Sequence, residues 1–555
     1  MSHLRQIILR NLTPSFALTV RRYFCRFPAR LISATRRCSP YLPAKQSHLT
    51  LLPPSGFSTT SSPVLCRTQT TAPHSPQIQS SNPYSHFVKT TDEIQISPPP
   101  GSVPATSLPL TFFDITFLGV KPIQRVFFYN IPNCNVPHFR QTILPNLTSS
   151  LSLALRYFYP FAARLVSPSQ PGKPYIRYSD GDSVSLTVAE TALDFDQVST
   201  DLPNDAALLH TLLPKLPPAE SKPDDDGAIV APLLAVKITL FPDSGVCIGF
   251  EFLHVAADGL AFSNFVKSWA SICRSGGEDS SWVENSPPCL DRSLIHDPRN
   301  LKDIFTEQVW NFAEAWQDDS ILCKHSGKVR ATFAIDREDI SRLKAVVNRD
   351  NFGDGKQLPP ASAFAVTSAL IWTNLMKSLD LVEEKAGEDG GGGEKIDSNV
   401  IVADFRGRLD PPLPATYFGN CVGVKIVSVK RRQLLGDDGF VVAAKAITAG
   451  VQGLGEEALE DAEKWITGFG EAFKFGKVVT VAGSPRMRVY ESDFGWGRPR
   501  KVEPVQIDTS DTVYISDARD EERGGLEFGL VLRKDEMDTF VTLFEKLLNQ
   551  LRQVD

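Results

Sequence analysis

Apolar and polar positions alternate most regularly between residues 246 and 269. Apolar residues occupy every second position over 246–252, which predicts a strand with one buried face. They recur at helical spacing over 262–269, which predicts an amphipathic helix. His254 and Asp258 stand in the turn between these elements. Because rigid elements on both sides set its position, this polar pair is a candidate site for chemistry.

The same periodicities predict further elements before residue 275. The sequence Pro-Asp-Ser-Gly at 242–245 is typical of a turn, so the strand over 233–241 is expected to form a hairpin with the strand that leads to His254. Further strands are predicted at 124–131, 173–179 and 182–190, and one helix or two at 136–159.

Residues 275–300 contain much Gly, Ser, Pro and Asp and show little periodicity, which is typical of a connection between two lobes. Beyond them, Asp336 is the expected N-cap of a helix, and the glycine-rich residues 387–395 predict a mobile loop. Other helices are predicted at 301–316, 361–376, 441–473 and 537–551, and strands at 328–335, 400–405, 422–429, 478–481, 488–490 and 526–532.

This alternation of strands and helices predicts the α/β (α+β) class in two lobes. The predicted organisation is a basic, disordered N-terminal extension over 1–84, a first lobe over 85–274, a linker over 275–300 and a second lobe over 301–555. His254 then belongs to the first lobe.

Composition narrows the class of protein. The hydrophobic content of 42% is that of a soluble globular protein, and no run of about 18 apolar residues predicts a membrane span. The nine cysteines never form a CxxC pair, which argues against a disulfide framework or a zinc site. The net charge is −6, and no basic stripe with interleaved aromatic residues follows the extension, so nucleic-acid binding is not expected.

The first 91 residues carry eleven basic residues and no Asp or Glu. Their richness in Arg, Ser, Thr and Pro is typical of an organelle transit peptide. An upstream sequence joined in error to the coding frame explains the same composition. After Met1 the next methionine is Met376, so the globular part has no internal start. Both interpretations stay open.

A His-x-x-x-Asp spacing is weak evidence on its own, because a chain with nine histidines produces it by chance. Without further context, His254 is equally a hydrogen-bonded residue at a strand end, and Asp258 the cap of the following helix. A metal site is not expected, since no further His, Cys or acidic cluster completes one.

Other motifs supply that context. HVAADG at 254–259 is followed by YFGNC at 417–421, VAGSPR at 481–486 and DFGWG at 493–497, and SPPPGSVPATSLPLTFFDI precedes them at 97–115. Over most of residues 87–550 the chain resembles the plant BAHD acyl-CoA-dependent acyltransferases. HVAADG, YFGNC and VAGSPR are most similar to the branch that transfers malonyl or other short acyl groups to flavonoid, anthocyanin or phenolic glucosides.

The resemblance implies a two-lobed fold related to chloramphenicol acetyltransferase, in which each lobe holds a mixed sheet with flanking helices and a solvent channel runs between the lobes. His254 would face this channel as the general base that takes the proton of the acceptor hydroxyl. Asp258, the second candidate catalytic residue, is expected to pair with a neighbouring arginine and fix the turn. Acyl-CoA would serve as cosubstrate, with no cofactor and no metal. The chain offers no Ser or Cys elbow that would indicate an acyl-enzyme.

The motif DFGWG is interpreted as structural, because two glycines around an aromatic residue are typical of a tight loop. Asp493 is expected to form a salt bridge with Arg406 or Arg408. The residues assigned to this structural motif are Asp493, Gly495, Trp496 and Gly497.

Five further residues are candidates for contact with substrate or CoA, and surface or core roles stay open for each. Arg164 follows Ala163 where the family usually has a glycine followed by a small or polar residue; it is a candidate partner for a malonyl carboxylate or a solvated loop residue. The other four are Tyr417, Asn420, Ser484 and Arg486.

The predicted function is transfer of malonyl from malonyl-CoA to a sugar hydroxyl of a phenolic or flavonoid glucoside. Hydroxycinnamoyl or acetyl transfer to an alcohol or amine, and an inactive binding protein of the same fold, are the alternatives. The expected partners are the acyl-CoA donor and a small phenolic glycoside, with no nucleic acid, no membrane and a monomeric state. The expected location is cytoplasmic, or a plastid or mitochondrion if residues 1–84 are a transit peptide.

Overall fold

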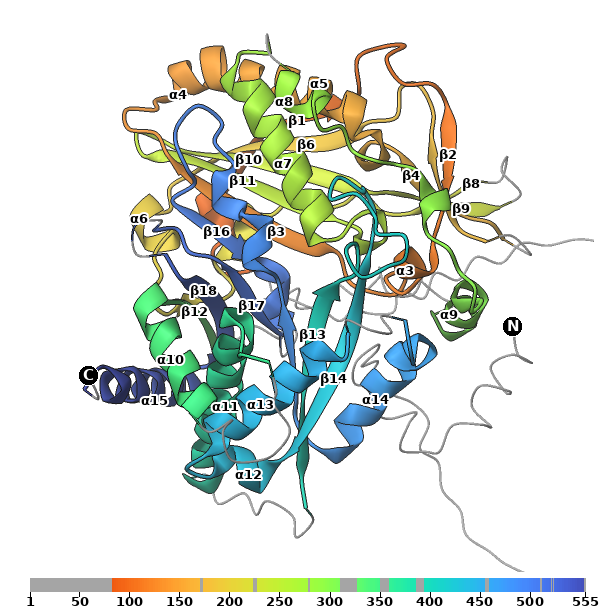
Figure 1. Cartoon of the computed structure of the whole chain (residues 1–555). Coiled ribbons are helices and arrows are strands. Elements are labelled where there is room, and N and C mark those ends of the chain that lie inside the picture. Colours follow the sequence, from red (N-terminus) through yellow and green to blue (C-terminus); the bar gives the residue numbers. More distant parts are fainter. Residues whose placement is uncertain are drawn as a thin grey trace, which may run out of the picture.

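The structure is a computed structural model. It describes residues 82–169, 173–222, 227–277, 280–309, 327–349, 359–385, 394–454, 459–509, 512–520, 522 and 524–553. Within these ranges the strands form sheets of six, seven and five strands, with helices packed on them in two lobes (Figure 1). The predicted α/β class is therefore confirmed. No helix in this part of the chain is long and apolar enough to cross a membrane.

Three predictions concern residues outside these ranges. Most of the predicted extension (residues 1–81), most of the predicted glycine-rich loop (residues 387–393) and the end of the helix predicted over 301–316 (residues 310–316) are not described. The described chain begins at Asn82, whose side-chain amide donates to the carbonyl of Ala207 at 2.7 Å. The Tyr84 hydroxyl contacts Asp205 at 3.0 Å, so these residues already pack on the body.

The six-stranded sheet forms the centre of the first lobe. The predicted hairpin is present, because β10 (Leu234–Phe241) pairs antiparallel with β11 (Gly245–Phe252). On its other side β11 pairs with β3 (Ile123–Asn130), so the strand that leads to His254 lies inside the sheet. The remaining strands are β1 (Val88–Ile96), β6 (Val184–Thr191) and β16 (Lys501–Pro504), in the order β1-β6-β10-β11-β3-β16.

Aromatic packing fixes helix α7 (Gly259–Arg274) on this sheet. Phe250 of β11 meets Phe262 and Trp269 of α7 edge to face, with ring centroids 5.2 and 6.0 Å apart. Such pairs contribute about 0.5–1.5 kcal/mol each beyond their buried area. Helix α5 (Leu144–Tyr157) packs beside α7 in the same core. The start of α7 is thereby held at the end of β11.

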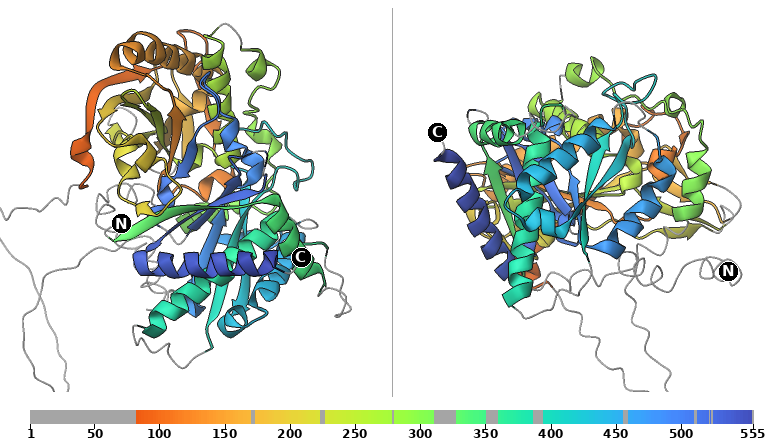
Figure 2. Two further views of the ribbon diagram at one scale, coloured as in Figure 1. Left: turned by 90° about the vertical axis from the view of Figure 1, so that its left-hand side faces the viewer. Right: turned by 60° about the horizontal axis from the view of Figure 1, so that its bottom comes forward.

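The seven-stranded sheet forms the second lobe and has helices on both faces (Figure 2). Helix α14 (Trp465–Phe475) packs on one face through Phe469, Ala472 and Phe473. Its strands, in spatial order, are β14 (Val422–Lys430), β13 (Ile396–Asp404), β15 (Val478–Ala482), β17 (Thr512–Asp517), β18 (Leu526–Arg533), β12 (Lys328–Ile335) and β7 (Asn204–Asp205). The helices that share the core of its other face are α10 (Arg337–Arg349), α11 (Ala363–Lys385), α13 (Gly439–Gln452) and α15 (Lys534–Arg552).

The two lobes exchange strands. β16 comes late in the sequence but pairs with β3 in the first-lobe sheet, where Figure 1 shows it in blue among earlier strands. β7 comes from the first half of the chain but pairs with β12 in the second lobe. Tyr417 and Phe494 also belong to the core around α7. Segments distant in sequence are therefore brought to the turn at His254.

A small third sheet lies at the edge of the first lobe. It consists of short antiparallel strands, one face of which packs on the same core as α5 and α7, whereas Val166, Ala228 and Val230 form a separate small cluster. Its strands are β2 (Thr106–Pro109), β5 (Tyr175–Tyr178), β4 (Arg164–Ser167), β9 (Ala228–Pro232) and β8 (Glu220–Lys222).

Two predicted elements are wrong. The helix predicted over 441–473 is two helices, since α13 ends before Gly453 and α14 begins at Trp465. The predicted strand over 488–490 is instead a 3₁₀ turn, because Arg488 has a left-handed backbone with φ of 49°, which a strand cannot contain. The expected cap at Asp336 is present, since its carboxylate accepts from the backbone N–H of Asp339 at 2.7 Å.

Candidate functional site

His254 lies at the end of β11, in one 3₁₀ turn that joins this strand to α7. Its ring stacks on Phe117 with the centroids 3.7 Å apart and the planes 6° from parallel. The residues that follow, 255–258, are buried, whereas His254 keeps part of its surface exposed. The imidazole is thus held on one face and still open to a small molecule.

Asn420 fixes the tautomer of His254. Its side-chain nitrogen lies 3.1, 2.8 and 3.2 Å from three acceptors, the carboxylate of Asp114 and the carbonyls of His254 and Val255. The amide oxygen is then the atom that faces the imidazole Nδ1, at 3.1 Å. An amide oxygen only accepts, so Nδ1 carries the proton and Nε2 keeps its lone pair.

Asp114 anchors Asn420 from a distant segment and was missed from the sequence. One oxygen accepts from the backbone and side-chain nitrogens of Asn420, at 3.0 and 3.1 Å. The other accepts from the backbone N–H and hydroxyl of Thr111, at 2.9 and 2.8 Å. Thr111 and Asp114 form a reciprocal cap of a short helix, and a Thr-x-x-Asp spacing is the sequence signal that marks such a cap.

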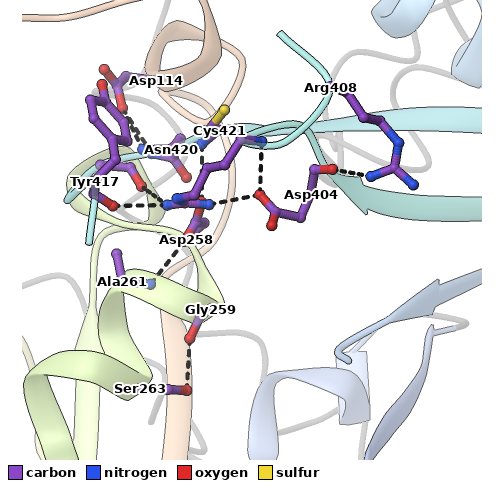
Figure 3. A network of polar contacts seen from close by, with 12 residues as sticks. Asp114, Asp258, Gly259, Ala261, Ser263, Asp404, Arg408, Tyr417, Asn420 and Cys421 are labelled. Atoms are coloured by element: carbon purple, nitrogen blue, oxygen red, sulfur yellow. Dashed lines mark hydrogen bonds and ion pairs between the residues drawn. The ribbon is translucent and has the colours of Figure 1, made fainter. Parts of the chain in front are cut away.

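Asp258 joins α7 to the second lobe (Figure 3). Its carboxylate caps α7 by accepting from Ala261 N at 3.0 Å, and it accepts from Cys421 N at 3.0 Å. Arg406 lies 2.8 Å from the same carboxylate, and both side chains are almost completely buried. The expected pair between Asp258 and a neighbouring arginine is therefore present. Asp258 is 1% exposed and its carboxylate contacts Ala261, Cys421 and Arg406, so it holds the turn in place.

The surroundings of His254 favour the neutral imidazole. Burial lowers the pKa of the His254 imidazole below its ordinary value of 6.5. The histidine's own backbone, Asp258 and the hydrogen bond to Asn420 oppose this shift in pKa, and the positive charge of Arg125 adds to it. Near pH 7 the ring is a free base.

The motif at 417–421 packs behind His254. Tyr417 is fully buried, and its hydroxyl accepts from Arg292 at 2.7 Å. Gly419 has φ of 145°, and a Cβ there would meet the Arg292 guanidinium at 1.6 Å, so only glycine fits. Burial raises the pKa of the Cys421 thiol far above its ordinary value, which makes this sulfur a poor nucleophile.

The DFGWG segment is a loop closed on itself. Asp493 accepts from the backbone N–H groups of Gly495 and Gly497 at 2.8 and 2.9 Å. Both glycines have positive φ, 102° and 87°. Trp496 stacks on Phe494 in the same loop, and both rings pack against Tyr129 of β3.

The predicted ion-pair partners of Asp493 are wrong. Asp493 lies 3.6 Å from Arg274, at the end of α7. Arg406 instead pairs with Asp258, and Arg408 donates to the backbone carbonyl of Asp404. Arg406 is held there because its strand end lies beside the start of α7, a contact that only the tertiary fold creates.

Within the described part of the chain, Ser484, Arg486 and Arg164 form no hydrogen bond or ion pair with His254. Ser484 accepts from Arg486 N at 3.2 Å at the start of a 3₁₀ turn, and the Arg486 side chain is exposed. Arg164 lies on β4 at 3.6 Å from Asp182, which gives it a counter-ion within the protein. Among the described residues no group of His, Cys, Asp and Glu could hold a metal ion.

Comparison with known proteins gives the same picture over the whole body. The model of the Transferase family matches residues 88–547. The chain is 38% identical to coumaroyl-CoA:anthocyanidin 3-O-glucoside-6''-O-coumaroyltransferase 1 of Arabidopsis thaliana, over 82% of this chain and 97% of the relative. It is also 38% identical to phenolic glucoside malonyltransferase 2 of the same plant, over 80% and 94%. Vinorine synthase has a similar fold, with a TM-score of 0.57 and 20% identity over 81% of this chain and 96% of the other.

Proposed function

This chain belongs to the Transferase family of BAHD acyl-CoA-dependent acyltransferases, and from this premise we propose that it transfers malonyl from malonyl-CoA to a sugar hydroxyl of a phenolic or flavonoid glucoside. The observation that supports the proposed mechanism most strongly is the partly exposed His254, whose Nδ1 hydrogen-bonds to Asn420 and whose Nε2 has no hydrogen-bond partner within the described ranges. A neutral imidazole in this tautomer is the base that a hydroxyl acceptor needs.

The reaction is a direct transfer. Nε2 of His254 takes the proton of the acceptor hydroxyl while the oxygen attacks the thioester carbonyl and forms the new C–O bond. The tetrahedral intermediate then breaks its C–S bond, and the departing CoA thiolate takes the proton back from His254. Stacking on Phe117 and the bond to Asn420 keep the ring in one orientation through both steps.

Asp258 is assigned a positioning role in this mechanism. Its oxygens are occupied by Arg406, Cys421 N and Ala261 N, so no substrate atom is expected to reach it. Tyr417 has the same role, because it is fully buried against Arg292. The channel to His254 is expected to run between the lobes. The exchanged strands bring segments of both lobes to the turn that contains His254.

A second candidate is transfer of a coumaroyl or other hydroxycinnamoyl group. The chain is as similar to a coumaroyltransferase as to a malonyltransferase, and both relatives are named for acceptors that are glucosides. Acetyl transfer, an amine acceptor and an inactive binding protein are weaker alternatives, because no feature of the site favours an acetyl donor, an amine acceptor or a loss of activity.

The test is incubation of the full chain with malonyl-CoA, coumaroyl-CoA or acetyl-CoA and a panel of phenolic and flavonoid glucosides, with CoA release and product mass measured. We expect malonyl esters on a sugar hydroxyl at the highest kcat/KM. Coumaroyl esters in their place would contradict the malonyl assignment and support the second candidate. No CoA release with any combination would contradict enzymatic function.

The cellular compartment and the oligomeric state are also part of the proposal. The chain is expected to act as a monomer in the cytoplasm, or in a plastid or mitochondrion if residues 1–84 direct it there. Fusion of residues 1–90 to a fluorescent protein tests the targeting alternative, which is contradicted if the fusion stays diffuse in the cytosol.

A further inference from the structure

One buried arginine in the described part of the chain differs from the other three. Buried arginines normally pair with carboxylates, because an isolated charge in the interior is costly. Three of the four obey this: Arg292 lies near Asp114, Arg330 contacts Glu503 and Asp508, and Arg406 contacts Asp258 and Asp404. Arg125 is the exception, since no ion pair within the described ranges involves it.

Arg125 is only 5% exposed, and its Nη1 is buried and has no hydrogen-bond partner among the described residues. Its guanidinium lies 4.2 Å from the centroid of the Tyr514 ring. Burial raises the pKa of the Tyr514 phenol, so this neighbour is neutral and supplies no negative charge. Arginine is always charged in proteins, so the guanidinium places a positive charge in the interior without a carboxylate partner among the described residues.

The position of Arg125 relates this charge to the candidate site. On β3 it lies opposite Phe250 of β11, four residues before His254. On its other side it lies opposite Pro504 of β16, and Tyr514 belongs to β17 of the second lobe. Arg125 thus reaches from the first-lobe sheet to the second lobe, beside the end of the strand that carries His254. Its charge acts on the His254 imidazole.

We propose that Arg125 binds the free carboxylate of the malonyl donor, an inference that rests on the proposed function. In malonyl-CoA one methylene separates this carboxylate from the thioester carbonyl. A receptor for it must therefore lie beside the reacting carbon, and hence close to the base. A carboxylate would supply both the missing counter-ion and the missing acceptor for Nη1. A coumaroyl or acetyl group would supply neither.

Arg164 is the competing arginine, and its surroundings argue against it. Asp182 already lies 3.6 Å from Arg164, and its strand β4 belongs to the small sheet rather than to the strands around His254. A substrate carboxylate would have to compete with Asp182 there.

The experiment compares donors within each variant of the full chain. For wild type, Arg125→Met, Arg125→Lys and Arg164→Met, kcat/KM is measured with malonyl-CoA and with acetyl-CoA at one pH with one acceptor, and binding of each donor is measured by calorimetry without acceptor. Loss of a charge-assisted contact predicts a fall of about 10- to 100-fold in the malonyl-to-acetyl ratio for Arg125→Met. Arg125→Lys should lose less, and Arg164→Met should keep the wild-type ratio.

The outcomes separate this inference from the proposed function. An equal fall with both donors would assign Arg125 to the oxyanion or to packing and overturn the inference, as would loss of the ratio in Arg164→Met alone. A wild type that makes coumaroyl but no malonyl esters would overturn the donor assignment and the inference together. If Arg125→Met fails to fold, Arg125→Lys decides: a folded variant with an unchanged donor ratio and unchanged malonyl-CoA affinity overturns the inference.

Discussion

The turn at 254–259 and the loop at 493–497 each contain an aspartate that accepts from backbone N–H groups, but they are built differently. Asp258 is 1% exposed and connects α7 to Arg406 and Cys421 of the second lobe. Asp493 accepts from two glycines of its own loop and has one longer contact with Arg274. The first aspartate cross-links distant segments, whereas the second closes a local one.

This difference separates two uses of a short motif. A buried pair that connects segments is costly to break, because one charge is left in the interior without its partner, at about 3–5 kcal/mol. An exposed ion pair contributes about 0–1 kcal/mol, so Asp493 acts mainly through its backbone contacts. The first motif is therefore expected to control the geometry of the site, and the second the shape of one loop beneath Tyr129.

The largest expected effect comes from His254→Ala. Loss of a general base should lower kcat by a factor of ~10²–10⁴, while the melting temperature stays close to that of the wild type because the ring is partly exposed. Steady-state kinetics and thermal unfolding check both parts. A folded variant with near wild-type turnover would remove His254 from the mechanism and leave the turn with a structural role alone.

Asp258→Asn is expected to have the largest effect on stability. It removes the buried carboxylate that faces Arg406 and leaves the partly exposed Asp404 as the remaining counter-ion, so it should reduce the free energy of unfolding by up to about 3–5 kcal/mol, with activity falling in parallel. Urea or thermal unfolding measures the loss. Arg406→Met combined with Asp258→Asn removes both charges and should recover part of the stability. No recovery in the double variant would show that the hydrogen bonds to Ala261 and Cys421 matter more than the ion pair.

The turn itself was predictable from the sequence, and its surroundings were not. Alternation over 246–252 and helical spacing over 262–269 predicted β11 and α7, and the turn at 242–245 predicted the hairpin with β10. These are local patterns. The pairing of Asp258 with a neighbouring arginine was also predicted, and the structure identifies that residue as Arg406.

What the sequence could not supply is the identity of distant partners. Asp114, Asn420 and His254 are brought together across as many as 306 positions, and nothing local in the chain marks the contact. The wrong partners proposed for Asp493 have the same cause. Arg406 and Arg408 were chosen from a sequence motif, without knowledge of where these arginines lie in the fold. No local sequence pattern marks Arg125. It stands out only because it is buried without a carboxylate nearby, and that is visible only in the described fold.

Asn420→Leu removes the hydrogen bond between the His254 ring and the second lobe, and therefore tests how much this contact contributes to the turn. Without its acceptor, Nδ1 no longer holds the proton in place, and kcat should fall by roughly 10- to 100-fold. The hydrogen bond to Asn420 raises the pKa of His254, so its loss should lower that pKa further. The acid limb of kcat/KM, which we expect below pH 6.5 in the wild type because the pKa of His254 is lowered, should then move to lower pH.

The pH profile distinguishes this role from simple destabilisation. A loss of folded protein scales the whole profile down without moving its limb, whereas a change at the imidazole moves the limb. Asp258 and Arg125 also act on His254, in opposite directions, and both are unchanged in this variant. An acid limb at the wild-type pH, or at a higher pH, would contradict the assigned contact.

Asp493→Ala is expected to have the smallest effect. Two backbone N–H groups lose their acceptor in a partly exposed loop, which should cost about 1–2 kcal/mol of stability. Turnover should fall modestly, through Trp496 and Phe494 losing their fixed position against Tyr129, and the pH limb should not move. Asp493→Asn keeps an acceptor oxygen, so its stability and turnover should lie between those of the wild type and of Asp493→Ala. Wild-type stability and turnover in Asp493→Ala would contradict a structural role for Asp493. A loss of unfolding free energy as large as that of Asp258→Asn would show that Asp493, like Asp258, connects distant segments rather than one loop.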